Sequence, residues 1–192
     1  MKRLETDRLI LDRWSKKDAR ELFAYASTPN VGPLAGWKPH ESVKESKMRI
    51  KKLFIPNGTW KIMLKDGAKP DDPRLEPGVA IGSIGFEPDI RRPEINAREL
   101  GYSLAEEYWG YGLMTEAGRA VIGYGFDDMD LDVISIETAP DNLRSQRVIE
   151  KLGFKYEGRL RDSYLTVDEE VRDTLVYSIL KSEWIKLRTG GI

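Results

Sequence analysis

In the second half of the chain the sequence alternates twice between a strand and a helix, with short connections. Strands are predicted over residues 98–104 and 133–138. Each is followed by apolar residues at the 3.6-residue spacing of an amphipathic helix, over 113–124 and 143–152. This strand–helix–strand–helix unit predicts helices packed on a sheet.

Further elements complete the sheet. Ser42 and Glu45 have the spacing of a capping box, in which the hydroxyl and the carboxylate each satisfy a backbone N–H at the start of a helix. Helices are predicted over residues 15–26 and 43–53, and strands over residues 8–14, 60–64, 79–86, 154–160 and 172–180. Together these elements predict an α/β or α+β fold with a mixed, mostly antiparallel central sheet and helices on both faces.

The length of 192 residues fits one domain of roughly 150–200 residues. With 40% apolar and 33% charged residues, the chain can bury a sizeable single core. It contains no internal repeat or linker. We therefore expect a single domain over residues 1–185, followed by a frayed tail over residues 186–192.

The charges nearly cancel, with 31 Lys and Arg against 32 Asp and Glu. This balance argues against a general nucleic-acid or anionic-membrane surface. No apolar run approaches the roughly 18–20 residues of a membrane span, and charges interrupt what would be a signal core. We expect a cytoplasmic protein without nucleic-acid or membrane partners.

The chain has no cysteine and one histidine. Disulfides, thiolate nucleophiles and acyl-cysteine intermediates are therefore excluded, and too few nitrogen ligands remain for an ordinary zinc site. We expect no metal.

A glycine turn at Trp109 to Met114 joins a predicted strand directly to a predicted helix. Such a turn points backbone N–H groups and the positive end of the helix dipole at one spot, which favours a bound phosphate. Alternatively, Gly110 and Gly112 serve only a tight turn. The turn lacks the GxxxxGK[ST] pattern and the third glycine of the dinucleotide fingerprint.

This turn and several other segments resemble a known family. Residues 108–117 (YWGYGLMTEA), 142–145 (NLRS) and 150–154 (EKLGF) resemble the general N-acetyltransferase (GNAT) superfamily. Within it, residues 4–9 and 176–184 are similar to the branch containing the N-terminal acetyltransferases of ribosomal proteins. The resemblance covers nearly the whole chain and implies a GNAT fold and acetyl-CoA as co-substrate.

The family's pyrophosphate loop reads Q/R-x-x-G-x-G/A, which aligns its marked positions with Trp109, Gly112 and Met114. Two of the three depart from the pattern, but backbone N–H groups hold the anion, so we expect them to change packing more than phosphate binding. The strand end at Leu104 would pair with pantetheine amides and hold the developing oxyanion. The resemblance implies these co-substrate-binding residues: Ser103, Leu104, Trp109, Gly110, Tyr111, Gly112, Leu113, Met114, Thr115, Asn142 and Ser145.

Acetyl transfer from a thioester to an amine needs a neutral amine and a proton for the leaving thiolate. Many family members supply that proton from a tyrosine, but this chain has Ile149 at the position. In the ribosomal-protein branch the serine of N-x-x-S, here Ser145, takes this role, and the helical period turns it inward. The alternative is a small polar residue in a first helical turn.

Glu99 and Glu137 are the candidate bases, each on a predicted central strand. Family members often place a base near Glu99, which we choose, although a rim carboxylate in a salt bridge is an equal alternative. Trp37 and His40, in a loop before the capped helix, are candidates for contact with the acceptor. A buried tryptophan anchor and a structural histidine are the alternatives.

The leading prediction is an acetyl-CoA-dependent N-acetyltransferase acting by direct attack in a ternary complex. The acceptor amine is either a protein N-terminus, as in the resembling branch, or a small molecule such as a polyamine, an amino sugar or an antibiotic. A CoA-binding module without catalysis is a further alternative. In such folds the exposed sheet edge often pairs with a second copy, which is compatible with a homodimer.

Overall fold

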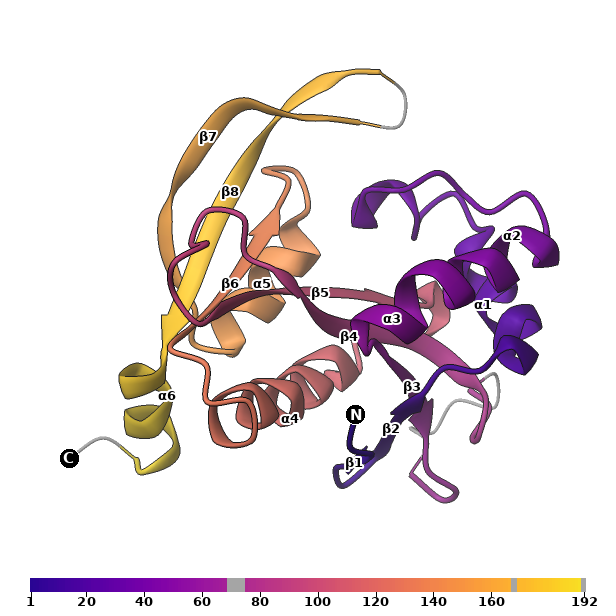
Figure 1. Cartoon of the computed structure of the whole chain (residues 1–192). Helices are drawn as coiled ribbons and strands as arrows, with labels where there is room; N and C mark the ends of the chain where they lie inside the picture. Colours follow the sequence, from indigo (N-terminus) through magenta and orange to yellow (C-terminus); the bar gives the residue numbers. More distant parts are fainter. Residues whose placement is uncertain (69–74, 167–168, 191–192) are drawn as a thin grey trace. The chain divides into compact units, whose positions relative to one another are not determined.

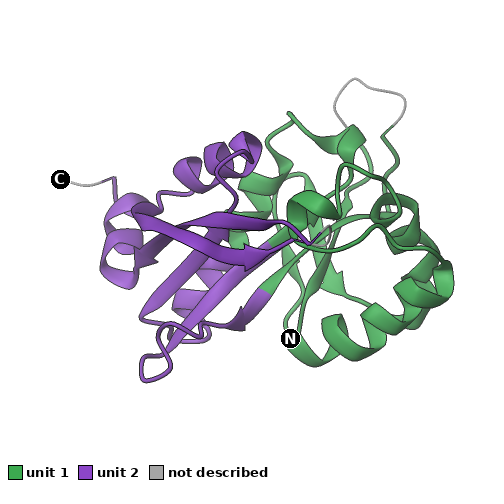
Figure 2. Ribbon diagram, turned by 90° about the horizontal axis from the view of Figure 1, so that it is seen from above, with its two compact units in different colours: residues 1–85, 102–120 green, residues 86–101, 121–192 purple. Residues whose placement is uncertain are grey.

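The computed structural model describes residues 1–68, 75–166 and 169–190. It divides into two compact units, residues 1–85 with 102–120 and residues 86–101 with 121–192 (Figure 2). The chain passes between the units inside β4, β5 and α4. Each crossing therefore lies in regular secondary structure, and we describe each unit by itself.

The described part of the chain contains an eight-stranded sheet in the order β1-β2-β3-β4-β5-β6-β8-β7. Strands β5 and β6 pair in parallel, whereas the pairs β1–β2, β2–β3, β3–β4, β6–β8 and β7–β8 are antiparallel. The predicted mixed, mostly antiparallel sheet is confirmed. The strands are β1 (Leu4–Glu5), β2 (Leu9–Arg13), β3 (Trp60–Leu64), β4 (Ala80–Pro88), β5 (Ala97–Leu104), β6 (Val133–Thr138), β7 (Lys155–Leu165) and β8 (Val171–Leu180).

The helices lie mostly where the hydrophobic spacing predicts them (Figure 1). They are α1 (Ala19–Ala26), α2 (Val43–Arg49), α3 (Ile55–Asn57), α4 (Leu113–Asp127), α5 (Leu143–Lys151) and α6 (Lys181–Arg188). Short 3₁₀ turns cover Lys16–Asp18, Pro33–Ala35 and Glu106–Tyr108.

In the first unit, strands β2 and β3 bury alternate side chains, as their two-residue pattern predicts. At the start of α2, the Ser42 hydroxyl accepts a hydrogen bond from the Glu45 N–H at 3.2 Å. The Glu45 carboxylate accepts from the Glu41 N–H at 2.8 Å, one residue before the position that a capping box predicts. Only half of the predicted capping box is therefore formed.

The helix predicted over residues 43–53 is not one regular helix. After α2 the chain forms a π-helical turn over Ile50–Phe54 and then α3. Pro56 has no N–H to donate four residues back, and its ring crowds the carbonyl there, so the wider turn precedes it.

In the second unit, the core is built from the buried faces of β6, β8, α4 and α5. Ile134, Ile149 and Ile179 are fully buried, and Phe126 of α4 packs against Trp184 with ring centroids 6.3 Å apart. Strands β7 and β8 form a long antiparallel ribbon, the ochre and yellow arm in Figure 1. Ribbon pairing in β7 extends to Leu165, five residues beyond the predicted end of that strand.

Helix α6 was not predicted. It begins with the Leu180 N–H donating to the Glu183 carboxylate at 3.0 Å, and it buries Trp184. Ile185 and Leu187 on the same helix are about half exposed, at 51% and 56%, so the sequence has no clear apolar stripe there. The helix ends at Arg188, whereas we expected a frayed tail from residue 186.

Candidate active site

The glycine turn has the backbone geometry of an anion-binding turn. Strand β5 ends at Leu104, the Ala105 N–H donates to the Ile81 carbonyl at 2.8 Å, and a 3₁₀ turn follows. Gly110 and Gly112 then adopt φ values of +86° and +76°, in the left-handed region that glycine tolerates. The turn therefore delivers the chain directly into the 15-residue helix α4.

Gly112 takes the N-cap position of α4. Its carbonyl accepts the N–H of Glu116 at 3.1 Å, which is the first hydrogen bond of the helix. Glycine has no side chain that could cap the next N–H groups, those of Leu113, Met114 and Thr115. The dipole of a 15-residue helix adds positive potential at the same place. These features fit a bound pyrophosphate.

Trp109 occupies the position where the family pattern has Gln or Arg. Its indole Nε1 donates to the Leu104 carbonyl at 2.8 Å and so ties the turn to the end of β5. Next to Leu104, the Ser103 hydroxyl lies 2.9 Å from that of Ser83, and both serines are buried. The strand end is thus fixed by side chains on both sides of Leu104.

His40 is held by structural contacts. Its Nδ1 lies 2.7 Å from the Ser46 hydroxyl, its N–H donates to the Ala26 carbonyl at 2.9 Å, and the side chain is buried. The Trp37 ring covers it, with centroids 5.1 Å apart. Burial lowers the pKa of His40 below its ordinary value, so the ring stays neutral near pH 7.

In the second unit, Asn142 and Ser145 lie together at the start of α5. The Asn142 side chain accepts the Ser145 backbone N–H at 3.1 Å, as an N-cap does. Ser145 is half-buried on the same side of the helix as the buried residues Ile149 and Leu152. The inward face that the helical period predicts is therefore the face that packs.

Glu99 and Glu137 have different surroundings. Glu99, on β5, is half-buried and opposite Ser135 in the parallel register with β6. Burial raises the pKa of Glu99; the Arg91 charge opposes this rise, and the Asp89 and Glu87 charges reinforce it. Glu137 instead forms an ion pair with Arg91. The two candidate bases thus differ in their contacts: burial raises the pKa of Glu99, and Glu137 has an ion-pair partner.

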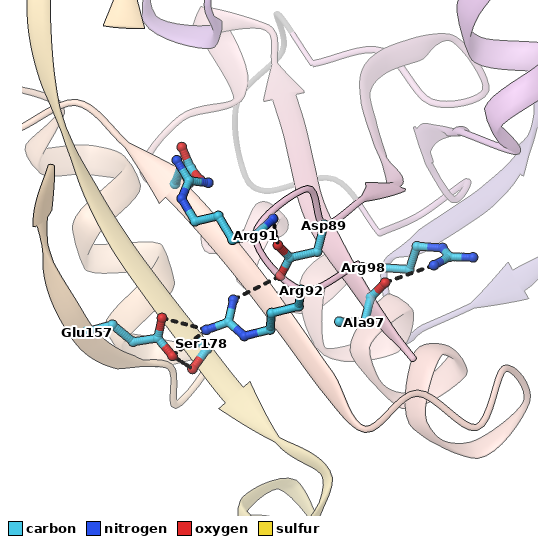
Figure 3. Close-up of polar contacts among 8 residues, drawn as sticks. Asp89, Arg91, Arg92, Ala97, Arg98, Glu157 and Ser178 are labelled. Carbon is cyan, nitrogen blue, oxygen red and sulfur yellow. Dashed lines mark hydrogen bonds and ion pairs between the residues drawn. The ribbon is translucent and has the colours of Figure 1, made fainter. Parts of the chain in front are cut away.

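A charged network around the buried carboxylate of Asp89 supports the loop between β4 and β5 (Figure 3). The Asp89 carboxylate accepts the Arg91 N–H and the Arg92 guanidinium, each at 2.9 Å. Arg92 also donates to both oxygens of Glu157 at 2.6 Å, and Ser178 donates to Glu157 at 2.5 Å. The sequence did not predict this network because its central contact joins Arg92 to Glu157, which lie 65 residues apart in the chain.

The described ranges, 1–68, 75–166 and 169–190, contain no group of three or more acidic or histidine side chains arranged to hold a metal ion. None of the helices in those ranges is long and apolar enough to cross a membrane.

Comparison with known proteins identifies the family. A model of the acetyltransferase (GNAT) domain matches residues 8–155. The chain is 33% identical over 178 residues to the uncharacterized N-acetyltransferase YoaA of Bacillus subtilis (strain 168), covering 93% of this chain and 96% of that protein. It is 30% identical over 196 residues to the ribosomal protein uS5-alanine N-acetyltransferase of Escherichia coli (strain K12), covering 95% and 92%.

A solved structure, the GNAT-family acetyltransferase from Bacillus anthracis, superposes with a TM-score of 0.80 at 22% identity, covering 94% of this chain and 99% of that one. This chain belongs to the GNAT acetyltransferase family and is an acyltransferase that acts on an amine. The family implies acetyl-CoA as co-substrate.

Proposed function

We propose that this enzyme transfers acetyl from acetyl-CoA to the N-terminal α-amine of a protein, of the ribosomal-protein type. The observation that carries this proposal is the similarity to the uS5-alanine N-acetyltransferase, which extends over 95% of the chain. A small-molecule amine is the alternative acceptor.

The chemistry of an α-amine agrees with the proposal. Its pKa is about 7.7–8.0, so deprotonation at pH 7 costs roughly 1 kcal/mol, against about 4–5 kcal/mol for a lysine with a pKa of about 10.4. A single half-buried carboxylate is sufficient for that task. We assign the proton acceptor to Glu99, whose pKa burial raises.

The remaining roles fall to residues described above. Acetyl-CoA supplies an activated acetyl thioester. The turn from Trp109 to Thr115 binds the pyrophosphate through backbone N–H groups, and Leu104 offers its backbone to the pantetheine amides. Ser145 donates a proton to the thiolate sulfur, and Asn142 contacts pantetheine. Trp37 contacts the acceptor; the contacts of His40 leave it a supporting role beneath Trp37.

The test compares acceptors with the purified protein and acetyl-CoA. Peptides with free N-terminal alanine or serine are compared with the same peptides blocked at the N-terminus and carrying an internal lysine, with spermidine and with an aminoglycoside. We expect CoA release only with the free N-termini, and mass spectrometry should place the acetyl group on the α-amine. Acetylation of spermidine, the aminoglycoside or lysine alone would overturn the proposed acceptor.

A further inference from the structure

Glu116, in the first turn of α4, is held by the N-terminal hairpin. Its carboxylate accepts the Thr6 hydroxyl at 2.5 Å, the Arg8 N–H at 2.9 Å and the Arg8 Nε at 2.7 Å. Burial acts to raise the pKa of Glu116, but these hydrogen bonds and the Arg8 charge keep it below its ordinary value. The side chain is therefore a carboxylate at neutral pH, although only 19% of it is exposed.

The same arginine also reaches the glycine turn. Arg8 Nη1 donates to the Tyr111 carbonyl at 3.0 Å, and Nη2 lies 3.8 Å from the position that a Cβ on Gly112 would occupy. One guanidinium thus connects the carbonyl before Gly112 with the carboxylate one helical turn after it. Thr6, which shares Glu116 with Arg8, is fixed in turn by the Leu9 N–H at 2.9 Å.

Glu116 places a negative charge at the anion-binding end of α4, and Arg8 offsets that charge. A helix N-terminus attracts an anion, but a carboxylate in the first turn repels one at the same place. The Arg8 guanidinium offsets that charge and holds the turn through the Tyr111 carbonyl. Without the guanidinium, the Glu116 carboxylate would keep its hydrogen bonds from Thr6 and the Arg8 N–H, but its negative charge would stand unneutralised in the first turn of the helix.

We propose that Arg8 is a positioning residue for the co-substrate: it fixes the glycine turn through the Tyr111 carbonyl and neutralises Glu116, so that the turn accepts a pyrophosphate. This inference rests on the proposed function, in which that turn binds acetyl-CoA. It assigns Arg8 no part in the chemical step, so its removal acts on KM rather than on kcat.

The primary test measures acetyl-CoA affinity by calorimetry and steady-state kinetics. Arg8→Ala should raise Kd and KM for acetyl-CoA about 10- to 100-fold, the loss expected for a charge-assisted hydrogen bond, with kcat within about twofold. The double variant Arg8→Ala/Glu116→Gln should recover part of the affinity because the unpaired charge is gone. Arg3→Ala is the matched control, since Arg3 pairs with Glu5 in the same hairpin at 3.0 Å and is half exposed. It should bind as the parent does.

A second acetyl donor distinguishes a role in pyrophosphate binding from a merely structural role of Arg8. Acetyl-pantetheine carries the thioester but no pyrophosphate, so Arg8→Ala should change its KM by less than about twofold. An equal loss with both donors would overturn the inference, as would Arg8→Ala binding acetyl-CoA like the parent. If Arg8→Ala does not fold, Arg8→Lys decides: it keeps the charge but not the two-atom bridge, and parent-like affinity would overturn the bridging role.

If the glycine turn is not the acetyl-CoA site at all, the same measurements give a different result. If the parent does not bind acetyl-CoA, or Gly112→Val binds it as well as the parent, the proposed co-substrate site is wrong. If the parent binds, Gly112→Val does not, and Arg8→Ala is indistinguishable from the parent, only the role of Arg8 is wrong.

Discussion

The absence of a side chain at Gly112 matters for two reasons: the backbone angle of the residue and the approach of an anion to its backbone. Its φ of +76° is in the left-handed region, and it stands at the N-cap of α4, where an anion would approach the backbone. Because an added Cβ would meet only the far end of Arg8, at 3.8 Å, packing alone does not require glycine here. Glycine is required here by the positive φ and by the space that the approaching ligand needs.

Gly112→Val should abolish measurable acetyl-CoA binding, because a β-branched side chain strains the backbone at positive φ and crowds the phosphate. Gly78→Val is the matched control: Gly78 has a φ of +77° and open space around it. Both variants should lose stability in urea unfolding, but only Gly112→Val should lose affinity in calorimetry. An affinity within a few-fold of the parent would refute the role of Gly112.

Ser145→Ala should lower kcat by roughly 10²-fold or more, the range of general acid catalysis, and leave acetyl-CoA affinity nearly intact. The helix cap survives this change because Asn142 accepts the backbone N–H of Ser145, not its hydroxyl. Rapid-quench and steady-state turnover measure the effect, and Ser163→Ala, on the exposed ribbon, is the control. Turnover equal to that of the parent rejects the proton-donor role.

At the scale of elements, the parallel pair β5–β6 presents two glutamates with different electrostatic surroundings. Burial raises the pKa of Glu99, and Glu137 forms an ion pair with Arg91. A raised folded-state pKa means that Glu99 contributes stability below its unfolded pKa, and that this contribution is lost as pH rises through the folded value. Above the folded-state pKa, the ionised Glu99 side chain therefore destabilises the fold relative to its protonated form.

Glu99→Gln should raise the urea midpoint at pH 8, with a smaller effect at pH 4, and should lower kcat/KM by about 10²-fold or more. In the parent, kcat/KM should fall as pH drops through the raised pKa of Glu99, and the variant should lack this limb. Glu137→Gln is the matched control with the opposite sign, since it breaks the ion pair with Arg91 and should lower the midpoint. A parent-like pH profile for Glu99→Gln would exclude it as the base.

At the scale of the whole molecule, much of the polar stabilisation joins segments that are distant in sequence. The Asp89 side chain is only 1% exposed. Burial acts to raise its pKa, but hydrogen bonds from Ser135, Arg92 and Arg91 keep it lowered. Arg92 extends the network to Glu157, 65 residues away along the chain. A lowered pKa contributes stability above the unfolded value, which is lost as pH falls through the folded one.

Asp89→Asn should lower the free energy of unfolding by about 1–3 kcal/mol at pH 7, because the buried carboxylate loses its charge-assisted hydrogen bonds with Arg92 and Arg91, while Arg92 keeps Glu157 as a partner. The difference from the parent should shrink as pH falls below about 4, where the carboxylate of the unfolded chain becomes protonated, and vanish once pH passes below the lowered folded-state pKa. Urea unfolding followed by circular dichroism at pH 7 and at low pH measures both. A constant difference across this pH range would contradict a charge-based role.

The sequence by itself determined the elements and the family. Local rules suffice for them: a two-residue or 3.6-residue apolar period, the Asn142 cap and the glycine turn depend on neighbours a few residues apart. Helix α6 was not predicted because it buries only one of its apolar residues, Trp184, and so carries no clear apolar stripe. Strand β1 was not predicted because two residues are too few to show a period.

Only the tertiary structure decided how the charges pair. In the sequence, Glu99 and Glu137 are similar strand glutamates. In the fold, Glu137 forms an ion pair with Arg91, whereas burial raises the pKa of Glu99 although the Arg91 charge opposes the rise. The fold also brings Arg8 to Glu116, 108 residues away. Electrostatic partners depend on distance in space and on burial, and neither can be read from a linear pattern.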